Sequence, residues 1–148
     1  MPRVSAAVTI HDQPLEPVWR VVSHGRSLAE VTEHVLSVRE FAPLEGQPVT
    51  SWTVALNGSR VTWTQREVHV PSRLMTFSQI DGDFHVLSGA WRLDPLAGGV
   101  RVTLDIEFDL GVDGLAPLLD PTWSRSLQVH AEEILASVAT HLRLRSAN

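Results

Sequence analysis

Three side chains in this sequence are candidates for acid–base chemistry, namely Glu67, His85 and His130. A carboxylate or an imidazole that is sheltered from water can take up and release a proton near neutral pH, as general acid–base catalysis requires. Each also has a structural interpretation, because charged residues are rarely buried and a lone histidine is commonly a surface group. The three residues are therefore catalytic candidates whose orientation the fold must decide.

The local pattern indicates where these side chains point. Glu67 has the same parity as Trp63 in a strand-like run, so both should lie on the inward face. His85 has the parity of Trp91 in the next run, and we expect it to point inward as well. His130 lies at the edge of the apolar stripe of a C-terminal helix, where it could line a pocket against that helix.

Eight further residues could form the walls of a binding pocket. Tryptophans present a flat aromatic surface, Gln79 could hydrogen-bond a ligand carbonyl, and Gly89 beside Trp91 would leave room for a flat ligand. The alternative is that the aromatic residues only fill the core and that Gln79 bonds to a neighbouring strand. The candidate binding residues are Trp63, Gln65, Met75, Phe77, Gln79, Leu87, Trp91 and Trp123.

Composition excludes several classes of function. The 148 residues carry a formal net charge of -5, and the basic residues do not cluster, so nucleic acid is a poor candidate partner. There is no cysteine and no tyrosine, which excludes disulfides, thiolate chemistry and a phenolic acid or base. No run is apolar enough to span a membrane, and the N-terminal residues show no basic region followed by an apolar one, so we expect a cytoplasmic protein.

Motifs for metals and phosphates are also missing. The segment around Glu132 and Glu133, next to His130, has no partner pair with ligand spacing elsewhere, so we expect no metal site. The sequence has neither a glycine-rich phosphate loop nor a Gly-x-Ser-x-Gly elbow. These absences favour a site built from a shaped pocket and a few polar side chains.

The elements that must position these residues can be read from periodicity and turn signals. Alternation predicts a first strand over 3–11, and Pro17 suits the first turn of a short helix that ends at Gly25. Ser27 can cap a second short helix over 28–35. Asp120 and Pro121 form a start signal for one long helix over 122–144. Further strands are predicted at 36–43, 49–56, 60–70, 73–80, 84–93 and 100–110.

The order of these elements predicts the fold class. A series of antiparallel strands followed by a helix packed on one face is an α+β arrangement. Six to seven strands that wrap around one long C-terminal helix, with two short helices after the first strand, form a helix-grip fold. This fold encloses a hydrophobic cavity, and a chain of this length forms one domain over residues 1–148. The helix stripe that faces the sheet comprises Leu127, Ala131, Ile134, Leu135, Val138 and Leu142.

Several local motifs resemble a known superfamily. Residues 7–22 resemble the opening strand and Pro-x-x-x-Val-Trp helix of the START/Bet v 1-like superfamily (SRPBCC), with Val18 and Trp19 at the usual place. The Trp63 strand, the Phe77-x-Gln79-x-x-Gly82-x-Phe84 segment and the Gly89-x-Trp91 strand resemble its polyketide cyclase/dehydratase branch. That branch includes the aromatase/cyclases of bacterial aromatic polyketide pathways and coenzyme-Q-binding relatives.

The resemblance implies a function as well as a fold. Aromatase/cyclases bind a poly-β-ketone tethered to a carrier protein, promote an intramolecular aldol reaction and assist dehydration, without a metal or redox cofactor. These enzymes carry an inward arginine downstream of the strand tryptophan. This chain has Glu67 on that face and Arg66 on the other, unless a bulge intervenes. The departure leaves open a carboxylate acid or base at Glu67, or a pocket used only for binding.

Three functional hypotheses follow. The first is a cofactor-independent cyclase/aromatase-like enzyme, the second a carrier for a lipid, quinone or hydrophobic metabolite, and the third a regulatory protein with an exposed apolar patch. An enzyme pocket should contain convergent polar groups with perturbed pKa values, whereas a carrier pocket should be almost wholly apolar. The expected partner is a small hydrophobic or aromatic ligand, and the chain could be a monomer or a homodimer. A one-residue register slip would exchange the inward and outward faces.

Overall fold

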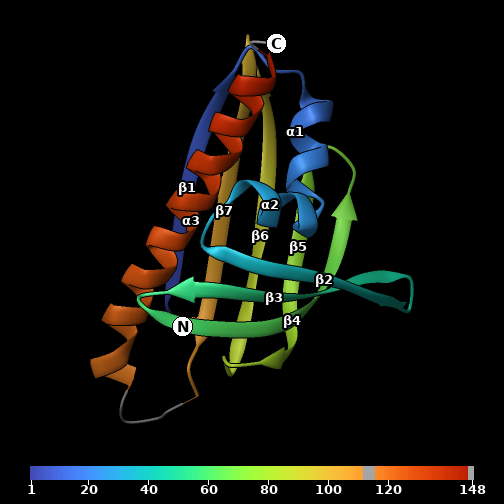
Figure 1. Ribbon diagram of the computed structural model, residues 1–148. Coiled ribbons are helices and arrows are strands. Elements are labelled where there is room, and N and C mark those ends of the chain that lie inside the picture. The colour runs from blue at the N-terminus through green and yellow to red at the C-terminus, as the bar shows by residue number, and fades with distance from the viewer. Residues whose placement is uncertain (112–115, 147–148) are drawn as a thin grey trace.

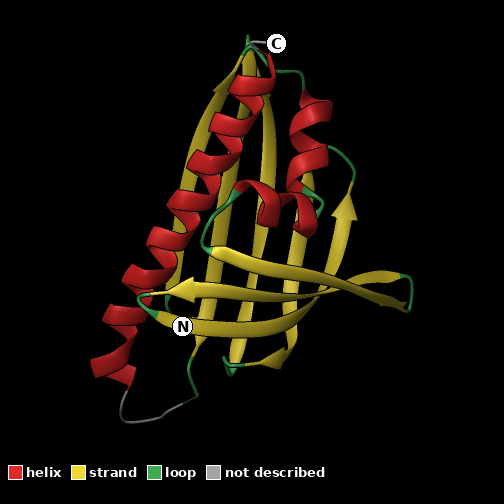
Figure 2. Ribbon diagram, viewed as in Figure 1, coloured by secondary structure: helices red, strands yellow, loops and turns green. Residues whose placement is uncertain are grey.

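One antiparallel sheet of seven strands forms the framework of the protein, in the order β1-β7-β6-β5-β4-β3-β2. The computed structural model describes residues 1–111 and 116–146 (Figures 1 and 2). Strands β2 to β7 pair in chain order, each with its neighbour along the chain. Strand β1 pairs with β7 at one edge of the sheet. The strands are β1 (Arg3–His11), β2 (Val35–Leu44), β3 (Gln47–Leu56), β4 (Ser59–Val70), β5 (Leu74–Gly82), β6 (Val86–Leu96) and β7 (Gly99–Asp109).

Three helices lie on one face of this sheet. The short helices α1 (Leu15–Val22) and α2 (Gly25–Val31) follow β1, and the long helix α3 (Ala116–Ser146) ends the chain. Figure 1 shows α3 running along β1 and β7, while β2, β3 and β4 cross the direction of the other strands. The bent sheet therefore wraps around the helix, which confirms the predicted α+β helix-grip fold. The strand predictions agree with the structure within three residues at every end.

Two predicted helix starts are wrong. The helix α3 begins at Ala116, so Pro121 lies inside the helix near its start instead of at its first position. Gly25 opens α2 instead of ending α1, and α2 ends at Val31. The reason for this glycine is close packing, because a Cβ there would lie 2.7 Å from Cγ1 of Val38 and 3.1 Å from the ring of Trp52.

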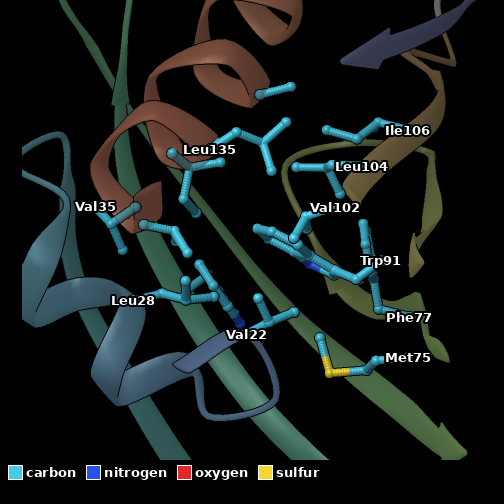
Figure 3. Close-up of a cluster of buried hydrophobic side chains, with 14 of the residues drawn as sticks. Val22, Leu28, Val35, Met75, Phe77, Trp91, Val102, Leu104, Ile106 and Leu135 are labelled. Carbon is cyan, nitrogen blue, oxygen red and sulfur yellow. The ribbon is translucent and has the colours of Figure 1, made fainter. Parts of the chain in front are cut away.

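The core lies between α3 and the concave face of the sheet. All six residues of the predicted helix stripe are at most 2% exposed. Inward residues of β7 from Val100 to Phe108 alternate with solvent-facing polar ones, as predicted. Figure 3 shows Leu135 of α3 facing Leu104 and Trp91 of the sheet. Because burial of such side chains is the main stabilising contribution to folding, the helix and the sheet should fold as one unit.

A matched pair of leucines near the end of α3 tests this packing. Leu142 is 1% exposed and Leu144 is 61% exposed. We expect Leu142→Ala to lower the free energy of unfolding by about 2–5 kcal/mol, because it leaves a cavity. Leu144→Ala should change it by no more than about 0.5 kcal/mol. Urea unfolding measures both, and equal losses in the two variants would contradict the packing of this turn against the sheet.

Candidate functional site

The inward face of β4 is the face that the sequence predicted. Trp63, Gln65 and Glu67 are each at most 5% exposed. A β-bulge lies opposite this stretch, because Thr64 pairs with Asp81 whereas Gln65 pairs with Gln79. The extra residue therefore belongs to β5, so β4 keeps its two-residue alternation and Arg66 stays on the opposite face.

An internal cavity lies where α3 meets this face, but it is small. Its volume is about 20 Å³, which is about the space that one water molecule requires. The rings of Trp52 and Trp63 stack in parallel, with centroids 5.9 Å apart, and fill much of the interior. The lining residues are Trp52, Trp63, Gln65, Phe77, Leu87, Trp91, Leu104, Ile106, Leu127, His130 and Ile134.

The space expected beside Gly89 is occupied by another side chain. A Cβ on Gly89 would lie 2.6 Å from the Cζ atom of Phe77, so the ring of Phe77 already covers this glycine. The expectation that Gly89 leaves room for a flat ligand is therefore wrong in this closed arrangement. Figure 3 shows Phe77 and Met75 beside Trp91, consistent with a packed wall.

A larger cleft lies outside the cavity, between α3 and the end of the β3–β4 hairpin. It has a volume of about 490 Å³, which lies within the range of small-molecule sites. Its walls include Asn57 at the hairpin turn and Arg125 on the helix. His130 lines both this outer cleft and the internal cavity, so it stands at the boundary between them.

A chain of hydrogen bonds connects His130 to the outer cleft. Nε2 of His34 lies 2.6 Å from Nδ1 of His130, and Nδ1 of His34 lies 3.2 Å from Oε2 of Glu133. If both imidazoles are neutral, His34 donates to Glu133 through Nδ1 and accepts at Nε2 from His130. Nε2 of His130 then carries the lone pair, and no described residue provides it with a hydrogen-bond partner.

Burial keeps His130 neutral. It lowers the pKa of His130 to about 3, and the charge of His34 adds to this effect. The pKa of His34 is also lowered by burial, whereas the Glu133 carboxylate opposes that shift. A proton taken up at His130 is therefore better accommodated on His34, beside the carboxylate.

Aromatic side chains extend from the cavity towards the start of α3. Phe84 makes edge contacts with Trp63, Phe108 and Trp123, at centroid distances of 6.2, 6.2 and 5.8 Å. Trp63 also meets the ring of His130 edge-on at 6.5 Å. The half-buried Trp123 thus joins the cavity aromatics through Phe84, near the start of α3.

Glu67 faces inward but is fully engaged with other protein groups. Its Oε2 accepts hydrogen bonds from Thr50 at 2.6 Å and Gln65 at 2.9 Å, and its Oε1 lies 2.9 Å from Nε2 of His69. Burial alone would raise the pKa of Glu67, but the hydrogen bonds from His69, Thr50 and Gln65 together lower it. Glu67 is therefore an ionised carboxylate at neutral pH, and Gln65 separates it from the cavity.

The same network holds the tryptophan wall. The indole of Trp52 donates to Thr50 at 3.0 Å, and the indole of Trp63 donates to Oε1 of Gln65 at 2.8 Å. Because Thr50 and Gln65 both donate onward to Glu67, the two stacked indoles are fixed through one carboxylate.

The inward orientation predicted for His85 is wrong. Its side chain is exposed, and β6 begins only at Val86. Phe84 and Leu87 are both buried, so the two-residue alternation does not extend back to His85. The backbone of Asp83 is anchored to Thr62, which turns the aromatic ring inward and leaves the histidine outside.

Gln79 bonds within the protein. Its Nε2 donates to the carbonyl oxygen of Phe84 at 2.7 Å, while its Oε1 is buried without a partner among the described residues. The amide therefore stabilises the connection that carries Phe84. The contact lies within the connection between β5 and β6, whereas the alternative interpretation of the sequence anticipated a bond to a neighbouring strand.

Sequence reasoning missed several members of the site. Trp52 alternates with Val54 and Leu56 in β3, so its inward position was readable from the strand period. Thr50 and His69 share the parity of Trp52 and Glu67 in their strands, so the same period was readable for them. His34 carries no comparable signal, because it precedes β2 and is 96 residues away from His130 along the chain.

Two further features of the described residues bear on the site. Within residues 1–111 and 116–146, no group of three or more histidine, aspartate or glutamate side chains is placed to hold a metal ion. None of the helices in the same part of the chain combines the length and the apolar character needed to cross a membrane.

Comparison with a family model shows the class of protein. Residues 12–129 match the family model described as polyketide cyclase / dehydrase and lipid transport, so the chain belongs to that family. No curated protein sequence matches the chain significantly.

Solved structures share the whole architecture. TTHA0849 from Thermus thermophilus is 24% identical, with a TM-score of 0.87 over 98% of this chain and 99% of its own. The Zhui aromatase/cyclase from Streptomyces sp. R1128 is 20% identical, with a TM-score of 0.82 over 98% of this chain and 95% of its own. The ginseng major latex-like protein 151 from Panax ginseng is 13% identical, with a TM-score of 0.61 over 88% of this chain and 97% of its own.

The neutral state of His130 predicts a specific pH dependence of stability. Its folded pKa of about 3 lies below the ordinary value of 6.5, so in that interval the unfolded chain binds a proton that the folded protein excludes. Stability should therefore fall on acidification, by about 2 kcal/mol between pH 7 and 5 for this group. Urea unfolding at the two pH values measures the loss of stability. The part of this loss that His130 causes should be absent in His130→Gln.

Comparing the pH dependence of stability in wild type and His130→Gln separates the contribution of His130 from those of His34 and Glu67. The lowered pKa of His34 acts in the same direction and remains in the variant. The folded pKa of Glu67 lies below 4.5, so Glu67 contributes its stability change at lower pH. An identical pH dependence in wild type and His130→Gln would show that His130 is not buried in the neutral form.

Proposed function

We propose that this protein is a cyclase/aromatase-like enzyme that acts on a polyketide or related hydrophobic natural-product intermediate, free or tethered to a carrier protein. The substrate occupies the space between the sheet and α3, and acid–base chemistry promotes intramolecular cyclisation and dehydration. Family membership and the shared fold support this class of function. The observation that carries the proposal is the buried, neutral His130, which lines the cavity and is hydrogen-bonded outward to His34.

His130 is suited to moving a proton between the cavity and the outer cleft. Its Nε2 takes a proton from an activated carbon of the substrate, and its Nδ1 passes a proton to Nε2 of His34. The positive charge then resides next to Glu133 instead of in the apolar interior. The reverse transfer supplies the proton that the departing hydroxyl group requires during dehydration. This relay offsets the weak basicity that burial imposes on His130 itself.

The pocket walls would align the reacting carbons. Flat indole and phenyl rings favour an extended conjugated or aromatic ligand, and holding two reactive carbons close together lowers the entropic part of the barrier. Because the cavity is nearly filled, the ligand must enter from the outer cleft and displace cavity side chains. The edge contact between Trp63 and His130 would be replaced by the substrate.

A non-catalytic carrier of a lipid, quinone or hydrophobic metabolite is the second candidate. Nine of the eleven residues that line the cavity are apolar, and one of the two polar ones, Gln65, is engaged with Trp63 and Glu67. Such a lining suits the retention of an apolar molecule without chemistry. The two functions predict different effects of replacing His130. In an enzyme the replacement lowers turnover, whereas in a carrier it affects ligand binding alone.

Binding can be tested through the tryptophans. We expect flat, multi-ring phenolic polyketide products to quench tryptophan fluorescence saturably, because a ligand in the cavity must contact Trp63 or Trp91. Trp91→Phe should weaken this binding while the protein stays folded by circular dichroism. Absence of quenching with these compounds, together with saturable binding of fatty acids or isoprenoid quinones, would favour the carrier.

Turnover tests the role of His130 directly. With a synthetic poly-β-ketone thioester as substrate, we expect His130→Gln to lower kcat by about 10²–10⁴-fold, as the loss of a general acid–base group does. His141→Gln on the same helix is the matched control and should retain wild-type kcat. Ring closure can be followed by absorbance of the aromatic product. Equal activity of the two variants would exclude His130 as the catalytic group.

A further inference from the structure

A second cleft lies between the α1–α2 junction and the β2–β3 hairpin. Its volume is about 280 Å³, and it shares no lining residue with the outer cleft or the internal cavity. The residues that line it are Ser23, His24, Gly25, Glu40, Phe41, Pro43, Pro48, Val49, Thr50, Glu67 and His69. None of these residues takes part in the proposed proton transfer, so the cleft needs an explanation of its own.

A carboxylate–imidazole pair forms one wall of this cleft. The strand alternation that turns Glu67 inward also places His69 on the same face, where its side chain is 26% exposed. Oε1 of Glu67 lies 2.9 Å from Nε2 of His69, while Thr50 and Gln65 hold the other carboxylate oxygen. The carboxylate is ionised, so Nε2 of His69 must carry the proton that it donates.

This arrangement leaves the second ring nitrogen of His69 available. With Nε2 protonated, the neutral imidazole presents a lone pair at Nδ1. No described residue supplies a hydrogen-bond partner for that nitrogen. The rings of Trp19 and His69 form a T-shaped contact with their centroids 5.9 Å apart. This contact restricts the orientation of the imidazole. A carboxylate behind an imidazole fixes its tautomer and strengthens its other ring nitrogen as a hydrogen-bond acceptor.

The other walls select the kind of ligand. Phe41, Pro43, Pro48 and Val49 provide an apolar surface from the β2–β3 hairpin. Glu40 and Glu67 make the cleft unfavourable for an anion. A neutral molecule with an aromatic ring and one good hydrogen-bond donor satisfies both conditions. Such a molecule would place its ring against the hairpin and its donor on His69.

The serine that lines this cleft is not activated by the neighbouring histidine. The hydroxyl of Ser23 lies 3.2 Å from Nδ1 of His24, but that nitrogen also lies 2.9 Å from the carbonyl oxygen of Arg20. Since a carbonyl only accepts, Nδ1 of His24 carries a proton and cannot take one from Ser23. The arrangement therefore supports binding rather than acyl transfer.

We propose that this cleft is a second ligand site, which binds a neutral phenol through a hydrogen bond from its hydroxyl group to Nδ1 of His69. Glu67 is a positioning residue in this site, because it fixes the tautomer and the ring orientation of His69 without touching the ligand. The proposal stands independently of the enzymatic function, because the cleft shares no lining residue with the internal cavity or the outer cleft.

Binding of 2-naphthol, followed by the imidazole nitrogen resonances in NMR, tests the site. We expect saturable shifts of the His69 resonances, with binding weakened at least about tenfold in His69→Leu, which removes the acceptor. Naphthalene lacks the hydroxyl donor and 2-naphthoate is an anion, so each should also bind at least about tenfold more weakly. Phe41→Ala tests the apolar wall independently and should weaken 2-naphthol as well, because Phe41 is 48% exposed and its truncation leaves the core intact.

The matched control is His130→Gln, which alters the internal cavity and should leave 2-naphthol binding to the cleft unchanged. Binding that disappears in His130→Gln but persists in His69→Leu and Phe41→Ala would place the ligand in the interior and overturn the proposal. Equal affinity for 2-naphthol and naphthalene would also overturn it, because the hydroxyl group would then contribute nothing. Failure of the turnover test for His130 would leave these outcomes unaffected.

Discussion

A carboxylate that is removed from water needs hydrogen-bond donors. The interior of this protein is arranged around one such carboxylate, that of Glu67, which has three donors. Glu67 receives hydrogen bonds from Thr50, Gln65 and His69, and the first two residues also accept the indole hydrogens of Trp52 and Trp63. Loss of any donor would leave part of a buried charge unpaired, which is costly. The stacking of the tryptophans, the shape of the cavity and the orientation of His69 therefore depend on this one charge.

Burial acts in opposite directions on the two buried ionisable groups of the interior. It raises the pKa of a carboxyl group and lowers that of an imidazole, because both effects disfavour the charged form. Glu67 has enough donors to reverse the effect and remains ionised. His130 has a single histidine neighbour and remains neutral. Glu67 is consequently held in place by its donors, whereas Nε2 of His130 has no hydrogen-bond partner among the described residues.

The stability of the closed interior and the need to admit a ligand oppose each other. Stacked and edge-to-face aromatic rings fill the space beneath α3, so the cavity holds about one water molecule. The clefts outside it are more than ten times larger. A ligand that enters must replace aromatic contacts with contacts of its own, which favours large flat molecules over small ones. The inward face of β4 carries Glu67, whereas Arg66 lies on the opposite face.

The sequence by itself determined which faces of the elements are buried. Strand alternation placed Trp63, Gln65 and Glu67 inward, the 3.6-residue period identified the stripe of α3, and Asn57 with Gly58 marked a hairpin that the backbone forms with positive φ at both residues. These are local properties, because each depends on a few neighbouring residues. The tertiary structure decided the rest. It placed the bulge in β5 and not in β4, turned His85 outward by starting β6 after it, and brought His34 to His130 across 96 residues. It also set the volume of the cavity, since packing between distant side chains, unlike periodicity, cannot be read from one segment of the chain.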